Sequence, residues 1–381
     1  VISSFKTDKG YGATEYFILS KKAVMVVDVQ SDVFTYVVPQ KVQAPNIPNH
    51  DYEVRLWNDR AMANNNTNIQ EVVFNSQLDY MGIDAFKNSN GTTTVTTLFF
   101  TGNPPKDMSS KKWDLGTTYS EFDNHITKIY VKKTKVEDYR SAIGWTGYAN
   151  RVEYQIKDLK ITHKYGTFSR EFDTDLNDYF RTKGACKLAA FVASETGIVA
   201  GHADYNSNKA NKIVVMRSID GYGGVPNDYG YLPAETGTLL KILDLETLPY
   251  DYYYTIGEKD QNTYNITSNI MQTVTEKGRT ITASTTPLYV LNANEGIFYR
   301  VPTAVDMPVH RAYALIPNTA GHAKVSFMFE GDEQLNSNPT SINNIQANDF
   351  NNTPYYNLNG QRVEKLQRGV YIHQGKKVVV K

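Results

Sequence analysis

Few side chains of this 381-residue chain could act as nucleophiles or bind transition metals, since it has 1 cysteine and 7 histidines. Cys186 lies next to a strongly apolar run, and no G-x-S-x-G turn is present to expose a serine nucleophile. We therefore expect Cys186 to be a buried structural thiol. The histidines show no H-E-x-x-H or H-x-H spacing, so the sequence predicts neither a zinc site nor a nucleophilic triad.

Carboxylates are more frequent, and one run of them has the spacing of the first half of a calcium loop. In Asp173-Thr-Asp-Leu-Asn-Asp178 oxygens recur at alternate positions, but Asp178 stands where such a loop needs glycine and Gly184 where it needs glutamate. His202 and Asp204 offer only two ligands. We predict polar turns in both places, with no metal and no cofactor. A carboxylate pair for glycoside hydrolysis would be assembled only by folding, so that activity stays an alternative.

A glycine-rich loop at residues 220–231 carries tyrosines that could contact a ligand. It lacks the G-x-G-x-x-G order and the following helix of a phosphate site. Tyr222, Tyr229 and Tyr231 could stack on sugar rings or on side chains of a partner, because tyrosine combines apolar area with a hydroxyl group. The alternative is a long hairpin that is held together by its own tyrosines.

The elements that must position these residues are strands. The chain has 27 Tyr and 16 Phe, and clusters of Thr, Val, Tyr and Ile alternate with Asn, Gly, Asp and Pro. Lys plus Arg and Asp plus Glu are each 40, so no net charge attracts nucleic acid. No apolar run approaches the roughly 20 residues of a membrane-spanning helix. We expect a folded, mainly β protein with no nucleic-acid partner and no membrane-spanning segment.

Three hexapeptides repeat one pattern, with apolar residues at the first, fourth and sixth positions. They are Ile69–Phe74, Val95–Phe100 and Ile126–Val131, and a second echo links Trp57–Met62 to Met81–Phe86. A short strand that recurs at roughly 20 to 29 residues is typical of a leucine-rich-repeat solenoid, in which each unit buries its apolar side against the next. The alternative is chance recurrence in a β-rich chain.

The repeat pattern also predicts which way the side chains point. We expect Phe86, Leu98 and Ile129 to face the interior of the stack. The polar residues between the apolar positions then form an outer row that could bind a ligand by shape and hydrogen bonding. The members of this outer row are Gln70, Glu71, Thr96, Thr97, Thr127 and Lys128.

Residues 54–152 resemble the BspA-like leucine-rich repeats of bacterial surface proteins. The resemblance rests on Met81-Gly-Ile-Asp-Ala-Phe86, on Phe100-Thr-Gly-Asn-Pro-Pro105 and on the run from Ile129 to Trp145. In that family an "IG-x-x-AF" step precedes a strand, and the last strand leads into a short capping helix. The resemblance implies a leucine-rich-repeat solenoid, and the segment 16–53 is similar to the first unit of such arrays.

Beyond about residue 168 the repeat gives way to strands separated by turn-rich gaps. These strands, from Lys187–Val192 to Lys324–Phe329, predict a β-sandwich or a partly closed barrel. The stretch Leu232–Lys241 and the strands after it resemble a β module in secreted proteins of Gram-negative gut and oral bacteria. The segment Tyr356–Lys381 resembles a C-terminal ending of such proteins that serves export or surface attachment in some of them. The alternative for this ending is a folded hairpin without such a role.

The expected fold is therefore mainly β, with an N-terminal leucine-rich-repeat solenoid followed by an antiparallel β-sandwich-like domain. We place the solenoid and its cap at 1–160, the β-sandwich-like module at 168–335, a linker at 336–353 and a C-terminal β-hairpin tail at 354–381. We expect the chain to divide near 154–167 into parts that fold separately.

The expected function is binding rather than catalysis, because a repeat array offers an extended surface and no catalytic constellation stands out. The resemblance implies a secreted or outer-surface protein of a Gram-negative bacterium, similar to an adhesin that binds a host extracellular-matrix protein or glycan. One alternative is a polysaccharide-associated protein or glycan-utilisation accessory, with or without hydrolase activity. Another is a purely structural surface component.

Overall fold

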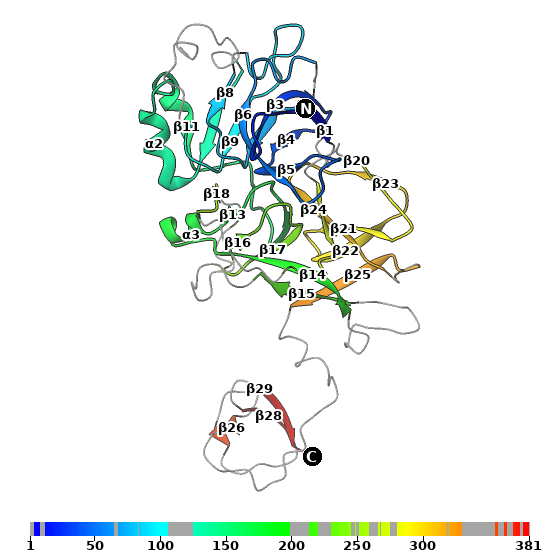
Figure 1. Ribbon diagram of the computed structural model, residues 1–381. Coiled ribbons are helices and arrows are strands. Elements are labelled where there is room, and N and C mark those ends of the chain that lie inside the picture. The colour runs from blue at the N-terminus through cyan, green and yellow to red at the C-terminus, as the bar shows by residue number, and fades with distance from the viewer. Residues whose placement is uncertain are drawn as a thin grey trace.

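The computed structural model shows a mainly β protein. The described residues are 4–7, 12–64, 68–82, 84–105, 125–198, 213–219, 230–244, 248, 251–258, 266, 268–274, 280–317, 319, 321–329, 355–356, 362–363, 369–373 and 376–380. Figure 1 shows an N-terminal unit in blue to blue-green, a second unit in green to orange beside it, and a C-terminal sheet apart from both. The predicted linker at 336–353 lies outside the described residues.

Two sheets enclose the core of the N-terminal unit. The first has the order β1 (Ser4–Thr7), β2 (Ala13–Ile18), β3 (Ala23–Gln30), β6 (Asp51–Trp57) and β5 (Lys41–Gln43), with β8 (Tyr80–Met81) also paired to β6. The second has the order β11 (Val152–Glu153), β10 (Lys128–Val131), β9 (Thr97–Phe100), β7 (Glu71–Phe74) and β4 (Thr35–Val38). Every neighbouring pair in this second sheet is parallel, and we call it the parallel sheet.

The three apolar hexapeptides supply β7, β9 and β10 in one shared register. Val72 pairs with Leu98, and Leu98 pairs with Ile129. The apolar side chains at the first, fourth and sixth positions of all three hexapeptides are at most 2% exposed. The prediction that Phe86, Leu98 and Ile129 face the interior is confirmed, since they are 1%, 0% and 0% exposed.

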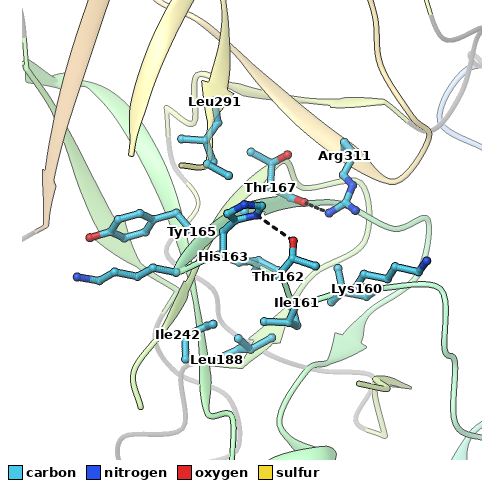
Figure 2. A pocket seen from close by; sticks show the side chains of 15 residues that line it. Lys160, Ile161, Thr162, His163, Tyr165, Thr167, Leu188, Ile242, Leu291 and Arg311 are labelled. Atoms are coloured by element: carbon cyan, nitrogen blue, oxygen red, sulfur yellow. Dashed lines mark hydrogen bonds between the residues drawn. The ribbon is translucent and has the colours of Figure 1, made fainter. Parts of the chain in front are cut away.

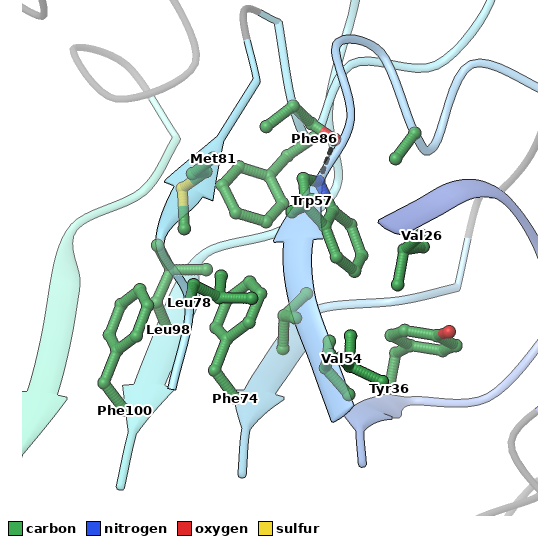
Figure 3. Packing of buried hydrophobic residues seen from close by; sticks show 14 of the residues in the cluster. Val26, Tyr36, Val54, Trp57, Phe74, Leu78, Met81, Phe86, Leu98 and Phe100 are labelled. Carbon is green, nitrogen blue, oxygen red and sulfur yellow. Dashed lines mark hydrogen bonds between the residues drawn. The ribbon is translucent and has the colours of Figure 1, made fainter. Parts of the chain in front are cut away.

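Aromatic rings fill the space between the two sheets (Figure 3). Phe74 and Phe100, which hold the same position in neighbouring strands, stack with their ring centroids 4.7 Å apart. Trp57 from the opposite sheet meets Phe74 edge-on at 5.4 Å, and its indole nitrogen donates a hydrogen bond of 3.1 Å to the carbonyl of Ala85. This bond satisfies the polar atom of a fully buried ring, which would otherwise be costly to bury.

Short helices close the open end of the N-terminal core. They are η2 (Lys133–Lys135), α2 (Val136–Ser141) and η3 (Thr146–Arg151), and they follow the strand β10 as the sequence motif indicated. Val136, Tyr139, Trp145 and Tyr148 from this cap are buried in the same core as the parallel strands. The core-facing side of β10 is therefore covered by this cap.

The second unit is built around one large sheet. Its order is β12 (Tyr165–Phe168), β17 (Thr238–Ile242), β14 (Leu188–Ile198), β15 (Ile213–Ser218), β25 (Lys324–Phe329), β22 (Ile297–Val301), β21 (Leu288–Asn292), β24 (Arg311–Leu315) and β19 (Met271–Val274). Among these strands only β15 and β25 pair in parallel, which departs from the expected antiparallel order. The sheet curls so that β12, at one end, comes close to β24, near the other end. A hydrogen bond shows this approach: Ser169, just after β12, donates its backbone N–H to the carbonyl of His310, just before β24, at 3.1 Å.

Smaller elements complete the described structure. The strands β16 (Tyr231–Leu232), β13 (Thr174–Asp175) and β18 (Thr255–Ile256) form a short sheet near α3 (Asp178–Lys183), and β20 (Thr280–Thr282) pairs with β23 (Ala304–Asp306). The C-terminal sheet has the order β27 (Arg362–Val363), β26 (Tyr355–Tyr356), β28 (Gly369–His373) and β29 (Lys376–Val380). The rest of the predicted C-terminal β-hairpin tail lies outside the described residues.

The second unit covers the outward face of the parallel sheet. Val37, Val73, Phe99 and Tyr130 point away from the N-terminal core and belong to a second core that is built mainly from the second unit. The rings of Phe99 and Phe172, one from each unit, lie 5.2 Å apart. The two units therefore share buried apolar surface.

The segment in which we placed the domain boundary is itself part of this shared core. Ile156 exchanges two backbone hydrogen bonds with Tyr254, at 2.9 and 3.1 Å. Leu159 and Ile161 are 4% and 6% exposed. The change from the parallel sheet to the large sheet does occur here, but the joining segment is packed into the shared core.

Candidate functional site

The predicted outer row lies at the amino ends of the parallel strands. Apart from Glu71, its members are exposed or partly exposed: Gln70, Thr96, Thr97, Thr127 and Lys128. Lys128 forms an ion pair of 2.8 Å with Glu153 of the neighbouring strand. Glu71 differs from the others, because its side chain faces the second unit and is only 12% exposed. The structure thus divides the predicted row into accessible polar residues and one carboxylate that joins the two units.

The partner of Glu71 is Arg170, whose side chain is fully buried where the units meet. Its Nη2 lies 3.1 Å from Glu71 Oε2, its Nη1 lies 3.3 Å from Asp158 Oδ2, and its Nε lies 3.4 Å from Glu171 Oε2. The guanidinium carbon also lies 4.6 Å from the ring centroid of Phe99. Arg170 therefore links a strand of the parallel sheet to the second unit by charge and by cation–π contact.

A histidine completes this group, and together the side chains have the donor types of a metal site. His310 Nε2 lies 3.1 Å from Glu71 Oε2, and His310 Nδ1 lies 3.6 Å from Glu171 Oε1. One ligand atom from each of these three residues lies within 4.8 Å of the others. Arg170, however, contacts the same Glu71 oxygen, so a metal ion would have to displace a guanidinium. We interpret the group as a charge network between the units, and we call it the interunit network.

The two glutamates of the interunit network have opposite pKa shifts. Burial alone raises the pKa of Glu71, but the charge of Arg170 together with the interactions of His310 and Thr35 outweighs that effect and lowers the pKa to about 2. Burial also raises the pKa of Glu171, and there Arg170 and His310 offset only part of it, so the pKa stays above its usual value. Two neighbouring carboxylates are therefore held in different environments, one of which strongly favours the ionised form.

The predicted tyrosine loop lies almost entirely outside the described residues, and this holds for Tyr222 and Tyr229. Tyr231 is described and is 8% exposed in β16. The guanidinium carbon of Arg181 lies 5.3 Å from its ring centroid. The ring of Tyr231 is therefore packed inside the second unit and offers no open face for stacking.

The structure also describes Cys186 and the run at 173–178 that resembles half a calcium loop. Cys186 is buried, as predicted, and its burial raises the pKa of the thiol to about 12, which disfavours a reactive thiolate. In the run that resembles half a calcium loop, Asp175 accepts a backbone hydrogen bond of 2.9 Å from Asn177, while Asp178 pairs with Lys133 at 2.7 Å. These carboxylates have separate partners and do not converge on one point.

A polar groove of about 510 Å³ lies at the carboxyl ends of the parallel strands, between the two units. Because carboxyl ends of parallel strands meet at one edge of a sheet, residues after successive strands gather there. The side chains on the N-terminal side are mostly amides and hydroxyls, from Gln40, Asn75, Gln77, Thr101, Asn103 and Thr134, and two lysines, Lys132 and Lys135, lie among them. The second unit supplies the opposite wall, which includes Asp173 and Glu258.

We call this pocket the strand-end groove, and hydrogen bonds hold its walls in place. Gln77 bridges to the next turn of the chain, since its amide accepts from the backbone N–H of Asn103 at 2.8 Å and donates to the carbonyl of the same residue at 3.1 Å. Asn75 donates across the unit boundary to the carbonyl of Glu171 at 3.0 Å. The side chains of Gln40 and Asn103 are exposed at the groove. The walls of the groove are thus held by hydrogen bonds, and the amides of Gln40 and Asn103 remain accessible.

The sequence contains a signal for this groove outside the hexapeptides themselves. Each of the first two apolar hexapeptides is followed, within three residues, by polar side chains: Asn75 and Gln77 after the first, Thr101 and Asn103 after the second. A repeated strand predicts that the residues just after it are also neighbours in space. The opposite wall, from residues 172–173 and 256–258, has no such signal.

Comparison of the chain with models of protein families, with curated proteins and with solved structures gives no match. Within the part of the chain that the structure describes, no helix combines the length and apolar character needed to cross a membrane.

Proposed function

We propose that the chain is a non-catalytic binding protein of the leucine-rich-repeat type, secreted or held on the outer surface of a Gram-negative bacterium. Its ligand is a host extracellular-matrix protein or a glycan, and it binds in the strand-end groove. The observation that carries this proposal is the gathering of amide and hydroxyl side chains from successive parallel strands in one groove between the two units. Ligand sites occur preferentially at such junctions between structural units.

The ligand chemistry follows from the side chains that line the groove. Amides both donate and accept hydrogen bonds, so a row of them suits a neutral polar chain such as a glycan or an extended peptide backbone. Neighbouring strands lie roughly 4.8 Å apart, so amides such as Gln40 and Asn103 recur along the direction of the stack. A ligand that lies across the strand ends would meet polar groups at several successive positions.

The carboxylates of the groove favour binding over hydrolysis. Glu258 accepts hydrogen bonds from the backbone N–H and the hydroxyl of Thr134, at 3.0 and 2.6 Å. Asp173 accepts from the backbone N–H of Ala234 at 2.9 Å. Both side chains therefore hold the walls of the groove together, a role that competes with proton transfer to a substrate.

The outward face of the parallel sheet is not the binding surface in this proposal. Its apolar positions, which include Val73 and Phe99, are covered by the second unit, and Glu71 belongs to the interunit network. The accessible part of the predicted outer row is therefore limited to residues at the strand starts, such as Thr96 and Thr127. They remain the competing site.

The experiment compares these two surfaces in the full chain. An array of matrix proteins and glycans identifies a ligand, and its affinity is then measured for two double variants. We expect Gln40→Ala with Asn103→Ala to weaken binding about tenfold or more, because hydrogen-bonding groups in contact with the ligand are lost. The matched control, Thr96→Ala with Thr127→Ala, removes equally exposed polar groups and should leave the affinity unchanged.

The opposite result, with binding lost only in the threonine pair, would move the site to the predicted outer row. Unchanged binding in both double variants would refute the groove. A screen in which soluble polysaccharides bind and matrix proteins do not would favour the alternative of a glycan-utilisation accessory.

A further inference from the structure

We propose a second binding site in the second unit, for the carboxylate or sulfate group of an acidic sugar. It is a pocket of about 220 Å³ between the segment 159–167 and Leu291 with Ala293 at the end of β21. This acidic-sugar pocket lies apart from the strand-end groove, with which it shares no lining residue. The proposal does not depend on the proposed function.

The pocket exists because the curled sheet of the second unit does not close along its whole length. The end strand β12 meets β24, the second-last strand at the other end, at Ser169, which bonds to the carbonyls of His310 and Arg311 through its N–H at 3.1 Å and its hydroxyl at 2.8 Å. Farther back along β12 lies Gly166, where an added Cβ would meet no atom within 4 Å. The open space begins at this point, and both Gly166 and Arg311 line it.

Apart from Tyr165, the ionisable side chains of the lining are all basic. They are Lys160, His163, Lys164 and Arg311, and none of the lining residues is Asp or Glu. Figure 2 shows His163, Thr162 and Thr167 gathered with Arg311 around the pocket. The amine of Lys160 extends away from this group, so Arg311 is the cation that lies with it. A protein with equal numbers of acidic and basic residues thus has a locally positive pocket.

Arg311 is the residue that would hold the anion. It is partly buried, and within the described residues its guanidinium donates one hydrogen bond, from Nη1 to the carbonyl of Thr167 at 3.1 Å. Within the described residues it forms no ion pair, so burial lowers its pKa, with only partial compensation from Asp158 and Tyr254. A guanidinium has five donors in a planar fork that matches a carboxylate or sulfate. Most of that capacity is unused at this pocket.

The remaining side chains suit a sugar ring that carries the anion. His163 Nδ1 is engaged with the hydroxyl of Thr162 at 2.8 Å, which leaves Nε2 for a ligand. Ile161, Leu188 and Leu291 give the pocket apolar walls. Pockets for small ligands combine such walls with a few placed polar groups. A pyranose has one apolar ring face and hydroxyls at its rim, so it meets both kinds of surface.

The test is titration calorimetry of the full chain with four probes: glucuronate, glucose 6-sulfate, glucose and glutamate. We expect the two acidic sugars to bind and glucose not to bind, because only the anionic group engages Arg311. Glutamate separates a sugar site from a general carboxylate site, and we expect it to bind at least tenfold more weakly than glucuronate.

Three variants locate the site. We expect Arg311→Gln to weaken glucuronate binding about tenfold or more, and Gly166→Val to do the same by filling open space without touching a charge. Arg300→Gln is the matched control, because it removes an exposed arginine of the same unit that does not line the pocket. Should Arg311→Gln fail to fold, Gly166→Val carries the test alone.

The proposal is overturned if glucose binds as well as glucuronate, if glutamate equals the acidic sugars, or if Gly166→Val leaves the affinity unchanged. Equal weakening by the Arg300→Gln control would also overturn it, since the attraction would then be a general charge effect. Binding of only one acidic sugar supports the site and identifies the anion as carboxylate or sulfate.

Discussion

At the scale of single residues, Glu71 shows how position and partner together determine what a side chain does. By its place in the hexapeptide it is equivalent to Thr97 and Lys128, with which it shares the register of the parallel sheet. Only Glu71 meets a buried arginine of the second unit, at 3.1 Å. A residue that the repeat pattern marks as exposed is therefore an internal ion-pair partner.

We predict that the two glutamates of the interunit network respond differently to substitution. Glu71→Gln should destabilise the protein by about 3 to 5 kcal/mol at neutral pH, because it removes a charge that is paired with buried Arg170. Glu171→Gln should be neutral or stabilising, because burial already disfavours the ionised form of that side chain. Urea unfolding of both variants measures the difference, and equal losses would contradict it.

We predict that the ionisation of Glu71 makes the free energy of unfolding depend on pH. Its pKa in the folded protein is about 2, below the ordinary value of 4.5, so its contribution is present above pH 4.5 and is lost as the pH falls towards 2. We expect the native protein to lose stability in that window and Glu71→Gln to lose less. Thermal unfolding between pH 2 and 6 checks this, and parallel curves for the two proteins would refute it.

We predict that Leu98→Ala costs about 2 to 5 kcal/mol, as large-to-small changes in a core do. The side chain of Leu98 is 0% exposed and lies between Val72 and Ile129 of the neighbouring strands. Chemical denaturation measures the loss. A change within about 0.5 kcal/mol, which is typical of surface positions, would show that the register is wrong.

At the scale of elements, the parallel strands are buried on both faces along part of their length. The fourth and sixth positions of each hexapeptide face the N-terminal core, and the fifth position faces the second unit. The fifth positions are Val73, Phe99 and Tyr130, which are apolar or aromatic in all three hexapeptides. Strands with both faces covered read as continuous apolar runs, and the three hexapeptides end in such runs, but the runs do not say what covers the second face.

The two faces of β9 should therefore both matter for stability. We predict that Phe99→Ala costs about 3 to 5 kcal/mol, because it removes a ring that packs on Phe172 and under the guanidinium of Arg170. Thr96→Ala just before the strand is the control and should change stability by less than about 0.5 kcal/mol. A Phe99→Ala variant as stable as this control would mean that the face is not covered in solution.

At the scale of the whole molecule, the shared core argues against parts that fold separately. The isolated fragment 1–160 would expose the apolar row that includes Val73, Phe99 and Tyr130, and it would lose Arg170. Contiguous apolar surface of this kind is rarely left exposed in a folded monomer. At the predicted boundary, residues 154–167, the parallel sheet gives way to the large sheet, but the two units on either side share one core.

We accordingly predict that the two units unfold together, and the chain offers a separate reporter for each. The three tryptophans, at 57, 113 and 145, all belong to the first 160 residues, while Cys186 is the only cysteine and lies in the second unit. Tryptophan fluorescence and the labelling of Cys186 by a thiol reagent should show the same urea midpoint. Two clearly separated midpoints would mean that the units fold independently.

The sequence by itself determined the mainly β character and the burial of the repeated apolar positions, because alternation and period act over a few neighbouring residues. It also marked the polar residues after successive strands, although not the groove that they form. The interunit network, the covered sheet face and the acidic-sugar pocket were decided only by the tertiary structure. Glu71 and Arg170 are 99 residues apart in the chain, and Arg311 and Thr167 are 144 apart. No local pattern links such residues, since their contacts arise only when one unit packs on the other or when a sheet curls onto itself.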